Sequence, residues 1–149
     1  MKRVIVASFT LLVIDLVIKS LVMNLMYIHQ KITVIPNFFH IFYVRNDGAA
    51  FSLFEGQQTW LILIALGVLT YIIYTIKKEK HFTKMNILLY GMLIAGITSN
   101  LIDRVLFGEV IDYLSFTIMG YGFPVFNLAD TMIVLSLTLY LLYSFKEAA

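Results

Sequence analysis

Long apolar stretches alternate with short polar segments along the chain. Four such stretches, at about 4–25, 58–77, 85–105 and 125–145, contain few charged residues. A helix needs about 20 residues to cross a hydrocarbon core of roughly 30 Å, and each stretch approaches that length. The pattern predicts an all-α polytopic membrane protein with four transmembrane helices, formed by residues 1–149 as a single membrane-embedded domain.

The composition agrees with membrane insertion and argues against several function classes. Hydrophobic residues make up 60% of the chain and charged residues 13%, whereas soluble domains are about 45–50% apolar. The first apolar stretch exceeds the roughly 7–15 residues of a cleaved signal peptide, so we expect it to be retained. The net charge of +2 is spread over the loops, which gives nucleic-acid binding little support. The chain has no cysteine and no H-E-x-x-H pattern, and we expect no metal and no cofactor.

Basic residues predict how the spans are oriented. Cytoplasmic segments carry an excess of Lys and Arg, which places both termini and the loop between the second and third spans inside. The loop at 26–57 then lies outside, although four basic or titratable residues within it weaken the signal without reversing it. The seven cations at the inner ends are Lys2, Arg3, Lys77, Lys78, Lys80, Lys84 and Lys146.

The outer loop at 26–57 has the composition of a small sheet. The segments "KITVIP" and "FFHIFYVRN" are rich in β-branched and aromatic residues, and the turn-forming "NDG" follows at 46–48. Such runs, bounded by turn residues, predict strands. We expect a small extracytoplasmic β-sheet and a loop cover between the first two spans, with "GAAFSLF" dipping into the outer lipid surface.

The last apolar stretch needs polar residues to complete a span. From Met132 to Phe145 it has 14 residues, about 21 Å of helix, so Asn127 and Asp130 must extend it. An ionised carboxylate at that depth is costly unless protein groups serve it, which favours a functional role for Asp130. The alternative is an ordinary helix cap, because Asp and Asn are both good N-cap residues.

Another polar group reaches the same outer boundary at the end of the third span. In "SNLIDR", Asn100, Asp103 and Arg104 have i, i+3 and i+4 spacing, which places them on one helical face. Gly108 is expected to end the helix. The alternative for Asp103 and Arg104 is a structural ion pair that fastens the helix end.

Two aspartates are therefore expected at similar depth on the outer side. Asp112 follows the helix break on a short apolar return segment beside the membrane, 18 residues before Asp130. Two close carboxylates in a partly desolvated site tend to share one proton, which provides an acid and a base together. An aspartic protease uses such a dyad to activate water for attack on an amide. The alternative for Asp112 is a solvated loop residue.

The remaining polar candidates have structural explanations of similar weight. Asp15 and Lys19 have the i, i+4 order of a helical ion pair. This pair either has a functional role, orienting the site or anchoring a substrate loop, or is a structural pair only. Asn46 is either a ligand or a turn former. Ser99 and Ser52 lack a base at a convincing spacing, which argues against a nucleophilic serine.

Four blocks of sequence resemble the lipoprotein signal peptidases, bacterial signal peptidase II. They are D-x-x-x-K in the 4–25 span, "RNDGAAFS", "SNLIDRVLFGEVIDY" and "FPVFNLAD", in the family's order and over nearly the whole chain. Departures include Ser99 where the family often has glycine. The resemblance implies Asp112 and Asp130 as the catalytic dyad. Its supporting residues are Asn46, Asn100, Asp103, Arg104, Asn127, Asp15 and Lys19.

This resemblance implies a specific reaction. The protein is expected to be a membrane aspartic endopeptidase that cleaves prolipoproteins immediately before a diacylglyceryl-modified cysteine, at the extracytoplasmic face of the bacterial cytoplasmic membrane. Inhibition by the cyclic peptide globomycin, a monomeric state and no nucleic-acid partner are also expected. The rival interpretations are a proton or ion conductor, since intramembrane carboxylates also mark transport paths, and a non-catalytic membrane assembly factor.

Overall fold

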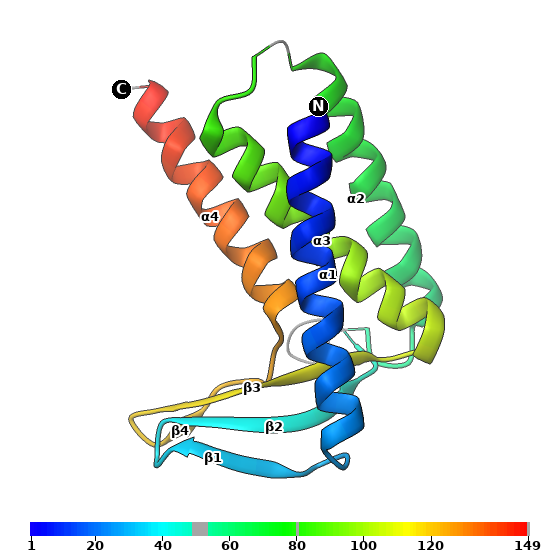
Figure 1. Ribbon diagram of the computed structural model, residues 1–149, viewed down its shortest axis with the longest axis vertical. Helices are drawn as coiled ribbons and strands as arrows, with labels where there is room; N and C mark the ends of the chain where they lie inside the picture. The colour runs from blue at the N-terminus through cyan, green and yellow to red at the C-terminus, as the bar shows by residue number, and fades with distance from the viewer. Residues whose placement is uncertain (49–53, 80, 149) are drawn as a thin grey trace.

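The computed structural model describes residues 1–48, 54–79 and 81–148, with side chains described as far as Tyr143. Most of "GAAFSLF", together with Ser52 and Lys80, lies outside these residues. A pair of strands follows α1, and a second pair of strands precedes α4 (Figure 1). The elements are α1 (Lys2–Leu25), β1 (Lys31–Ile35), β2 (Phe39–Asn46), α2 (Gln58–Lys78), α3 (Lys84–Phe107), β3 (Val110–Ile118), β4 (Tyr121–Gly122) and α4 (Leu128–Ala148).

The helices form a bundle, and the sheet projects from the end of the bundle that is far from both termini (Figure 1). α1, α2 and α3 are each long and apolar enough to cross a membrane, as predicted. The apolar part of α4, Leu128–Tyr143, is shorter. A membrane crossing by α4 therefore stays a prediction, as do the orientation and the single-domain assignment.

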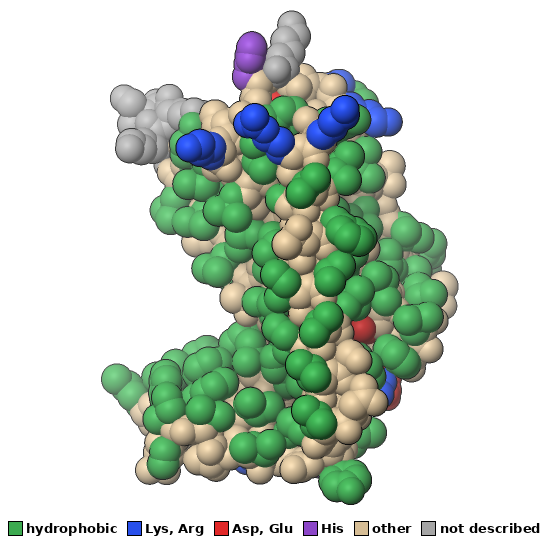
Figure 2. Space-filling view, viewed as in Figure 1, with side chains coloured by type: hydrophobic (Ala, Val, Ile, Leu, Met, Phe, Trp, Pro, Cys, Tyr) green, Lys and Arg blue, Asp and Glu red, His purple; other side chains and the backbone are tan. Residues whose placement is uncertain are grey.

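The outside of the bundle is apolar. Val6, Phe9 and Leu142 are 65%, 66% and 61% exposed, although each is a residue that a soluble protein would bury. Figure 2 shows hydrophobic side chains along the helices and Lys and Arg side chains at the helix ends near the termini. Extended apolar surface of this kind marks contact with lipid.

α3 is the central helix, in contact with α1, α2 and α4. Small residues let helix backbones approach closely in membranes, and α3 uses two glycines in this way. A Cβ at Gly96 would lie 2.5 Å from the carbonyl oxygen of Ala129, and a Cβ at Gly91 would lie 3.0 Å from the Cβ of Ala7. The contact at Gly96 holds the first turn of α4 against α3.

The sheet contains more of the chain than the sequence predicts. β1 and β2 come from the 26–57 loop, as expected, but β2 also pairs antiparallel with β3, and β3 with β4. The segment expected to be an apolar return after Gly108 is therefore a strand. Gly108 does end α3, in the left-handed region at φ 75°. The β2–β3 register places Val44 opposite Asp112 and Asn46 opposite Val110.

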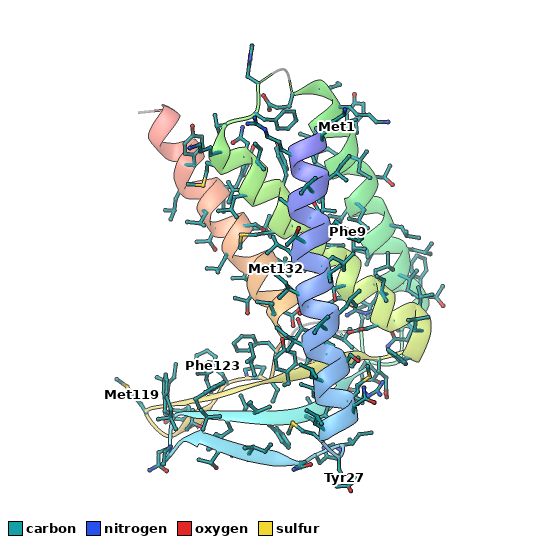
Figure 3. The ribbon with its side chains drawn as sticks, viewed as in Figure 1. Met1, Phe9, Tyr27, Met119, Phe123 and Met132 are labelled. Carbon is teal, nitrogen blue, oxygen red and sulfur yellow. The ribbon has the colours of Figure 1, made fainter. Side chains whose placement is uncertain are left out.

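An apolar cluster joins the sheet to the end of α1. Val22 of α1 and Met26, the residue after this helix, pack with Tyr43 of β2 and with Ile111 and Tyr113 of β3, all of them buried. The far end of the sheet extends away from the helices, with Met119 at its tip (Figure 3). This cluster fixes the root of β3, where Asp112 lies, against the bundle.

Candidate active site

The start of α4 positions Asp130 through a reciprocal cap. The backbone N–H of Asp130 donates to Asn127 Oδ1 at 2.8 Å, and the backbone N–H of Asn127 donates to Asp130 Oδ2 at 3.2 Å. This is the capping-box arrangement, in which an N-cap side chain and the third helical residue satisfy each other's backbone donors. The N-cap is therefore Asn127, and Asp130 is its partner three residues later in the capping box. The alternative of a capping role for Asp130 is confirmed to this extent, and Asp130 still has Oδ1 to bond elsewhere.

The root of β3 positions Asp112, which is 1% exposed. Its Oδ2 accepts a hydrogen bond from Asn46 Nδ2 at 2.9 Å, and its Oδ1 accepts one from Asn127 Nδ2 at 2.8 Å. Asn46 is itself oriented by the turn, because its Oδ1 accepts from the backbone N–H of Gly48 at 3.0 Å. Asn46 therefore acts both as a turn former and as a partner of Asp112, which is not a solvated loop residue.

Asn127 joins the two aspartates. Its side-chain amide contacts Asp112 and its backbone N–H contacts Asp130, and Asn127 itself is fully buried. The same side-chain nitrogen lies 3.1 Å from Asn100 Oδ1 and 3.2 Å from the carbonyl oxygen of Ile111. The structure thus brings Asp112 and Asp130 together around one asparagine, although they come from a strand and a helix.

Asn100 of α3 completes the hydrogen bonding of Asp130. Its Nδ2 donates to Asp130 Oδ1 at 2.7 Å, while its Oδ1 accepts from Lys19 Nζ at 2.9 Å. Because the amide oxygen faces donors and the amide nitrogen faces a carboxylate, the orientation of Asn100 is determined by its surroundings. Asn100 therefore connects Asp130 to the polar residues of α1.

Those residues of α1 form a buried ion-pair cluster with α3. Lys19 Nζ lies 2.7 Å from Asp103 Oδ2 and 3.2 Å from Asp15 Oδ2, and all three side chains are at most 2% exposed. Asp103 also accepts from the backbone N–H of Ile111 at 3.2 Å. The alternative of an ion pair between Asp103 and Arg104 is therefore wrong. The two are consecutive residues on α3, and Asp103 faces α1.

Arg104 instead reaches the turn after β2. Its Nη2 donates to the carbonyl oxygen of Gly48 at 2.9 Å, and its Nη1 lies 3.5 Å from the carbonyl oxygen of Asn100. Arg104 Nε is buried and has no hydrogen-bond partner among the residues the structure describes. The guanidinium thus holds the "NDG" turn beside the two aspartates.

Ser99 belongs to the ion-pair cluster, and sequence reasoning did not detect this role of Ser99. Its hydroxyl donates to Asp15 Oδ2 and accepts from Lys19 Nζ at 3.1 Å, and the side chain is fully buried. The i, i+4 spacing of Ser99 and Asp103 was the available signal. Tyr113 was also missed: burial raises the pKa of its phenol, and the protonated hydroxyl accepts from the backbone N–H of Leu128 at 3.3 Å.

The surroundings of Asp112 favour its protonated form. Its pKa is raised to about 7, first by burial and then by the negative charge of Asp130. Hydrogen bonds from Asn46 and Asn127 and the positive charge of Lys19 act in the opposite direction. A carboxyl group with such a pKa can donate or accept a proton near neutral pH, as acid–base chemistry requires.

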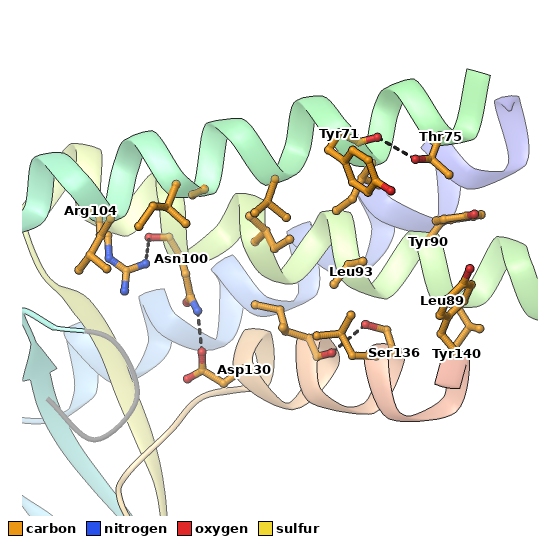
Figure 4. Close-up of a pocket in the computed structure, with 18 residues that line it drawn as sticks. Tyr71, Thr75, Leu89, Tyr90, Leu93, Asn100, Arg104, Asp130, Ser136 and Tyr140 are labelled. Atoms are coloured by element: carbon orange, nitrogen blue, oxygen red, sulfur yellow. Dashed lines mark hydrogen bonds between the residues drawn. The ribbon is translucent and has the colours of Figure 1, made fainter. Parts of the chain in front are cut away.

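A groove of about 640 Å³ leads away from Asp130 between α2, α3 and α4. One end is lined by Asn100, Arg104 and Asp130, and the other end by tyrosines (Figure 4). The side chains between these ends are mainly apolar. Asp112 is not among the lining residues, so Asp130 is the member of the pair that faces the groove. No group of three side chains suited to hold a metal occurs among the described residues.

Comparison with known proteins identifies the class of this site. The family model described as signal peptidase (SPase) II matches residues 7–146. Two solved structures, each described as a bacterial membrane enzyme, superpose closely. The one at 2.3 Å resolution has a TM-score of 0.92 and 31% identity, covering 100% of this chain and 91% of the other. The one at 1.9 Å has a TM-score of 0.87 and 32% identity, covering 98% and 94%.

Similar proteins with curated names agree with this class. A lipoprotein signal peptidase of Halothermothrix orenii is 38% identical over 136 residues, covering 91% of this chain and 90% of its own. One of Staphylococcus aureus strain MRSA252 is 32% identical over 146 residues, covering 98% and 89%. The chain is a transmembrane protease, and it belongs to the signal peptidase II family. The resemblance drawn from the sequence is confirmed.

Proposed function

We propose that this protein is an aspartic endopeptidase that removes the signal peptide of prolipoproteins immediately before the diacylglyceryl-modified cysteine. Membership of the signal peptidase II family supports a lipoprotein-processing protease in the bacterial inner membrane. The observation that supports the aspartic mechanism is that one buried asparagine, Asn127, donates hydrogen bonds to both Asp112 and Asp130 at the end of an apolar groove.

In the proposed reaction, Asp112 and Asp130 share one proton. The ionised carboxylate takes a proton from water, whose oxygen attacks the carbonyl carbon of the scissile amide, while the protonated partner donates to the carbonyl oxygen. The tetrahedral intermediate then collapses, the C–N bond breaks, and a proton passes to the leaving amine. The pKa of Asp112, raised to about 7, suits a group that exchanges protons at neutral pH. The two macroscopic ionisations belong to the pair.

Neighbouring side chains support this pair. Asn46, Asn100 and Asn127 donate to the carboxylate oxygens and hold both groups in place. Lys19 and Arg104 supply positive charge nearby, which offsets the negative charge of the aspartates. These are the positioning roles that a catalytic pair requires from its surroundings.

The distribution of charge supports the proposed membrane placement. Exposed Lys and Arg residues gather at the helix ends near the termini (Figure 2), which favours a cytoplasmic location for those ends. The dyad and the sheet are then at the extracytoplasmic face. A lipid-anchored cysteine lies at the same boundary, because its acyl chains occupy the outer leaflet while its peptide bond reaches the polar surface. Inhibition by globomycin, a monomeric state and a cover formed by the 26–57 loop remain predictions.

Cleavage of a lipidated prolipoprotein peptide by the purified protein in lipid nanodiscs tests this function. We expect Asp112→Asn and Asp130→Asn each to lower kcat by about a hundredfold to ten-thousandfold, because each removes the acid–base pair. Asp47→Asn is the control, since its side chain is not part of the pair. Undiminished cleavage by either dyad variant would contradict the assignment, and proton flux without cleavage would favour a conductor.

A further inference from the structure

The groove has a defined length. Tyr90 lies ten residues before Asn100 on α3, and Tyr140 lies ten residues after Asp130 on α4, and all four line the groove. At 1.5 Å per residue, each interval is about 15 Å long. Side chains such as Leu93 make the wall between these levels apolar. The distance along the groove from Asp130 to the tyrosines is therefore the length of a helix of about ten residues.

Three tyrosines make the inner end of the groove polar. Tyr71 of α2, Tyr90 of α3 and Tyr140 of α4 line this end, and Figure 4 shows them together with Thr75. Tyr90 lies within electrostatic range of Tyr71, Tyr140 and Glu79. We refer to Tyr71, Tyr90 and Tyr140 as the tyrosine triplet.

The triplet lies at one depth. Each of its members is six residues from a lysine at the inner end of its own helix, about 9 Å along the axis. These lysines are Lys77 on α2, Lys84 on α3 and Lys146 on α4. The triplet thus marks the level at which the apolar wall gives way to the charged inner surface.

A general preference of tyrosine for membrane interfaces does not explain the triplet. Tyr74 shows that ordinary behaviour: it is not among the groove-lining residues, and the Lys78 ammonium lies 4.2 Å from its ring centroid. The members of the triplet instead converge on the groove from three helices. Their arrangement fits an occupant of the groove.

We propose that the tyrosine triplet binds the basic N-terminal segment of the substrate's signal peptide and thereby sets the length of its apolar segment. The inference rests on the proposed function. Signal peptides have a positively charged segment followed by an apolar segment of about 7–15 residues. With the cleavage site at the dyad, a helical apolar segment of about ten residues places the first basic residue at the triplet. Aromatic faces and Glu79 attract a cation there.

The length selection is asymmetric. A signal peptide one turn or more too short draws its basic residue into the apolar wall, where an unpaired charge is costly. A longer one extends its basic residues past the triplet into the charged inner surface, at little penalty. Short apolar segments are therefore selected against more strongly than long ones.

Lipidated peptides that differ only ahead of the cleavage region test this proposal in nanodiscs. One series has apolar segments of about 6, 10 and 14 residues after two lysines, and a matched series has two glutamines instead. For the native protein we expect KM for the lysine series to be at least about tenfold higher at the shortest length. Tyr90→Leu and Tyr140→Leu are expected to raise KM for the middle lysine peptide about three- to tenfold, with kcat unchanged.

Three comparisons make the result specific. Tyr90→Phe keeps the ring and is expected to retain most of the preference for lysine over glutamine. Tyr74→Leu, on the neighbouring surface, is expected to behave as the native protein. Cleavage of the glutamine peptides at the native rate shows that each triplet variant is folded.

Two outcomes would overturn the proposal. In one, the triplet leucine variants keep the native ratio of KM between lysine and glutamine peptides, while cleavage itself continues and the proposed function stands. In the other, the native protein cleaves none of the lipidated peptides, and the proposed function fails together with the inference.

Discussion

Two groups of aspartates lie side by side at the end of the bundle next to the sheet, and they are held in different ways. Asp15 and Asp103 contact the ammonium of Lys19, at 3.2 and 2.7 Å. The hydrogen bonds to Asp112 and Asp130 come instead from asparagine amides and a backbone N–H. A contacting cation favours the ionised carboxylate strongly, whereas neutral donors leave it able to take up a proton. Under the proposed function, the first group is structural and the second group exchanges protons.

Asn100 connects the two groups. Its oxygen accepts from Lys19 and its nitrogen donates to Asp130, so the cation acts on the pair through an amide and not by direct contact. A lysine in direct contact with Asp130 would oppose proton uptake. The comparison therefore predicts that variants of the first group affect stability and variants of the second affect catalysis.

Removal of the cation is expected to have the largest effect. Lys19→Met leaves Asp15 and Asp103 as buried, uncompensated charges, so the free energy of unfolding should fall by about 3–5 kcal/mol. Denaturation in mild detergent, followed by circular dichroism, measures it. The exposed Lys84→Met is the control. Addition of Asp15→Asn and Asp103→Asn to the Lys19→Met variant should recover stability. If Lys19→Met alone lowers the free energy of unfolding by less than about 1 kcal/mol, the three charges do not stabilise one another.

The pH dependence of stability should distinguish Asp112 from the ion-paired aspartates. The pKa of Asp112 is raised to about 7 in the folded protein, against about 4 in the unfolded chain, so the folded state binds more protons between these values. The stability contributed by Asp112 is present below about pH 4 and is lost as the pH rises to about 7.

Asp112→Asn removes this loss because its amide does not ionise. Its unfolding free energy, relative to the native protein, should therefore rise between about pH 4 and 7, by on the order of 1–4 kcal/mol. Equilibrium unfolding across that range measures the difference. A constant difference over the whole range would mean that Asp112 is ionised in the folded state throughout.

Asn127 allows capping to be separated from the support of the dyad. Asn127→Ala removes both the cap and the amide donor, whereas Asn127→Ser keeps a capping oxygen and loses the donor to Asp112. We expect kcat to fall about tenfold to a hundredfold in both, because a donor to a catalytic group is lost. Only the alanine variant should lose a further ~1 kcal/mol of stability. Normal turnover in the serine variant would show that Asn127 serves the helix alone.

Ser99 is expected to have the smallest effect. Ser99→Ala removes one hydrogen bond to Asp15 and one from Lys19 but leaves both ion pairs, so stability should fall by about 1 kcal/mol. Thermal unfolding and kcat measured together test this, with kcat within about twofold of the native value. A large loss of kcat with normal stability would instead give Ser99 a part in catalysis.

The sequence predicted the spans and the main polar candidates because both depend on local patterns. Three apolar helices were visible from their length, and the block around Asn127 and Asp130 stood out because polar residues are costly at that depth. Gly108 was recognised as a helix end, since only a residue tolerant of positive φ suits that position. The bounds of β1 and β2 likewise follow from β-branched and aromatic runs.

Long-range packing limited the rest. Asp103 and Arg104 are neighbours in sequence, yet Asp103 faces Lys19 on α1 and Arg104 faces Gly48, since the position of α3 relative to α1 decides the partner. β3 was mistaken for an apolar return because its pairing partner lies more than 60 residues away. Ser99 escaped notice for the same reason, because its partner Asp15 is on another helix.

The glycine at the crossing of α3 and α4 has a consequence for how the groove can open. Backbone contact at Gly96 and Ala129 clamps α4 one residue from Asp130, whereas Tyr140 lies ten residues further along the same helix. A bulky occupant that pushes α4 aside would swing the Tyr140 end of this helix about that pivot. The groove thus has room to widen at that end for bulkier signal sequences while Asp130 stays beside Asn100.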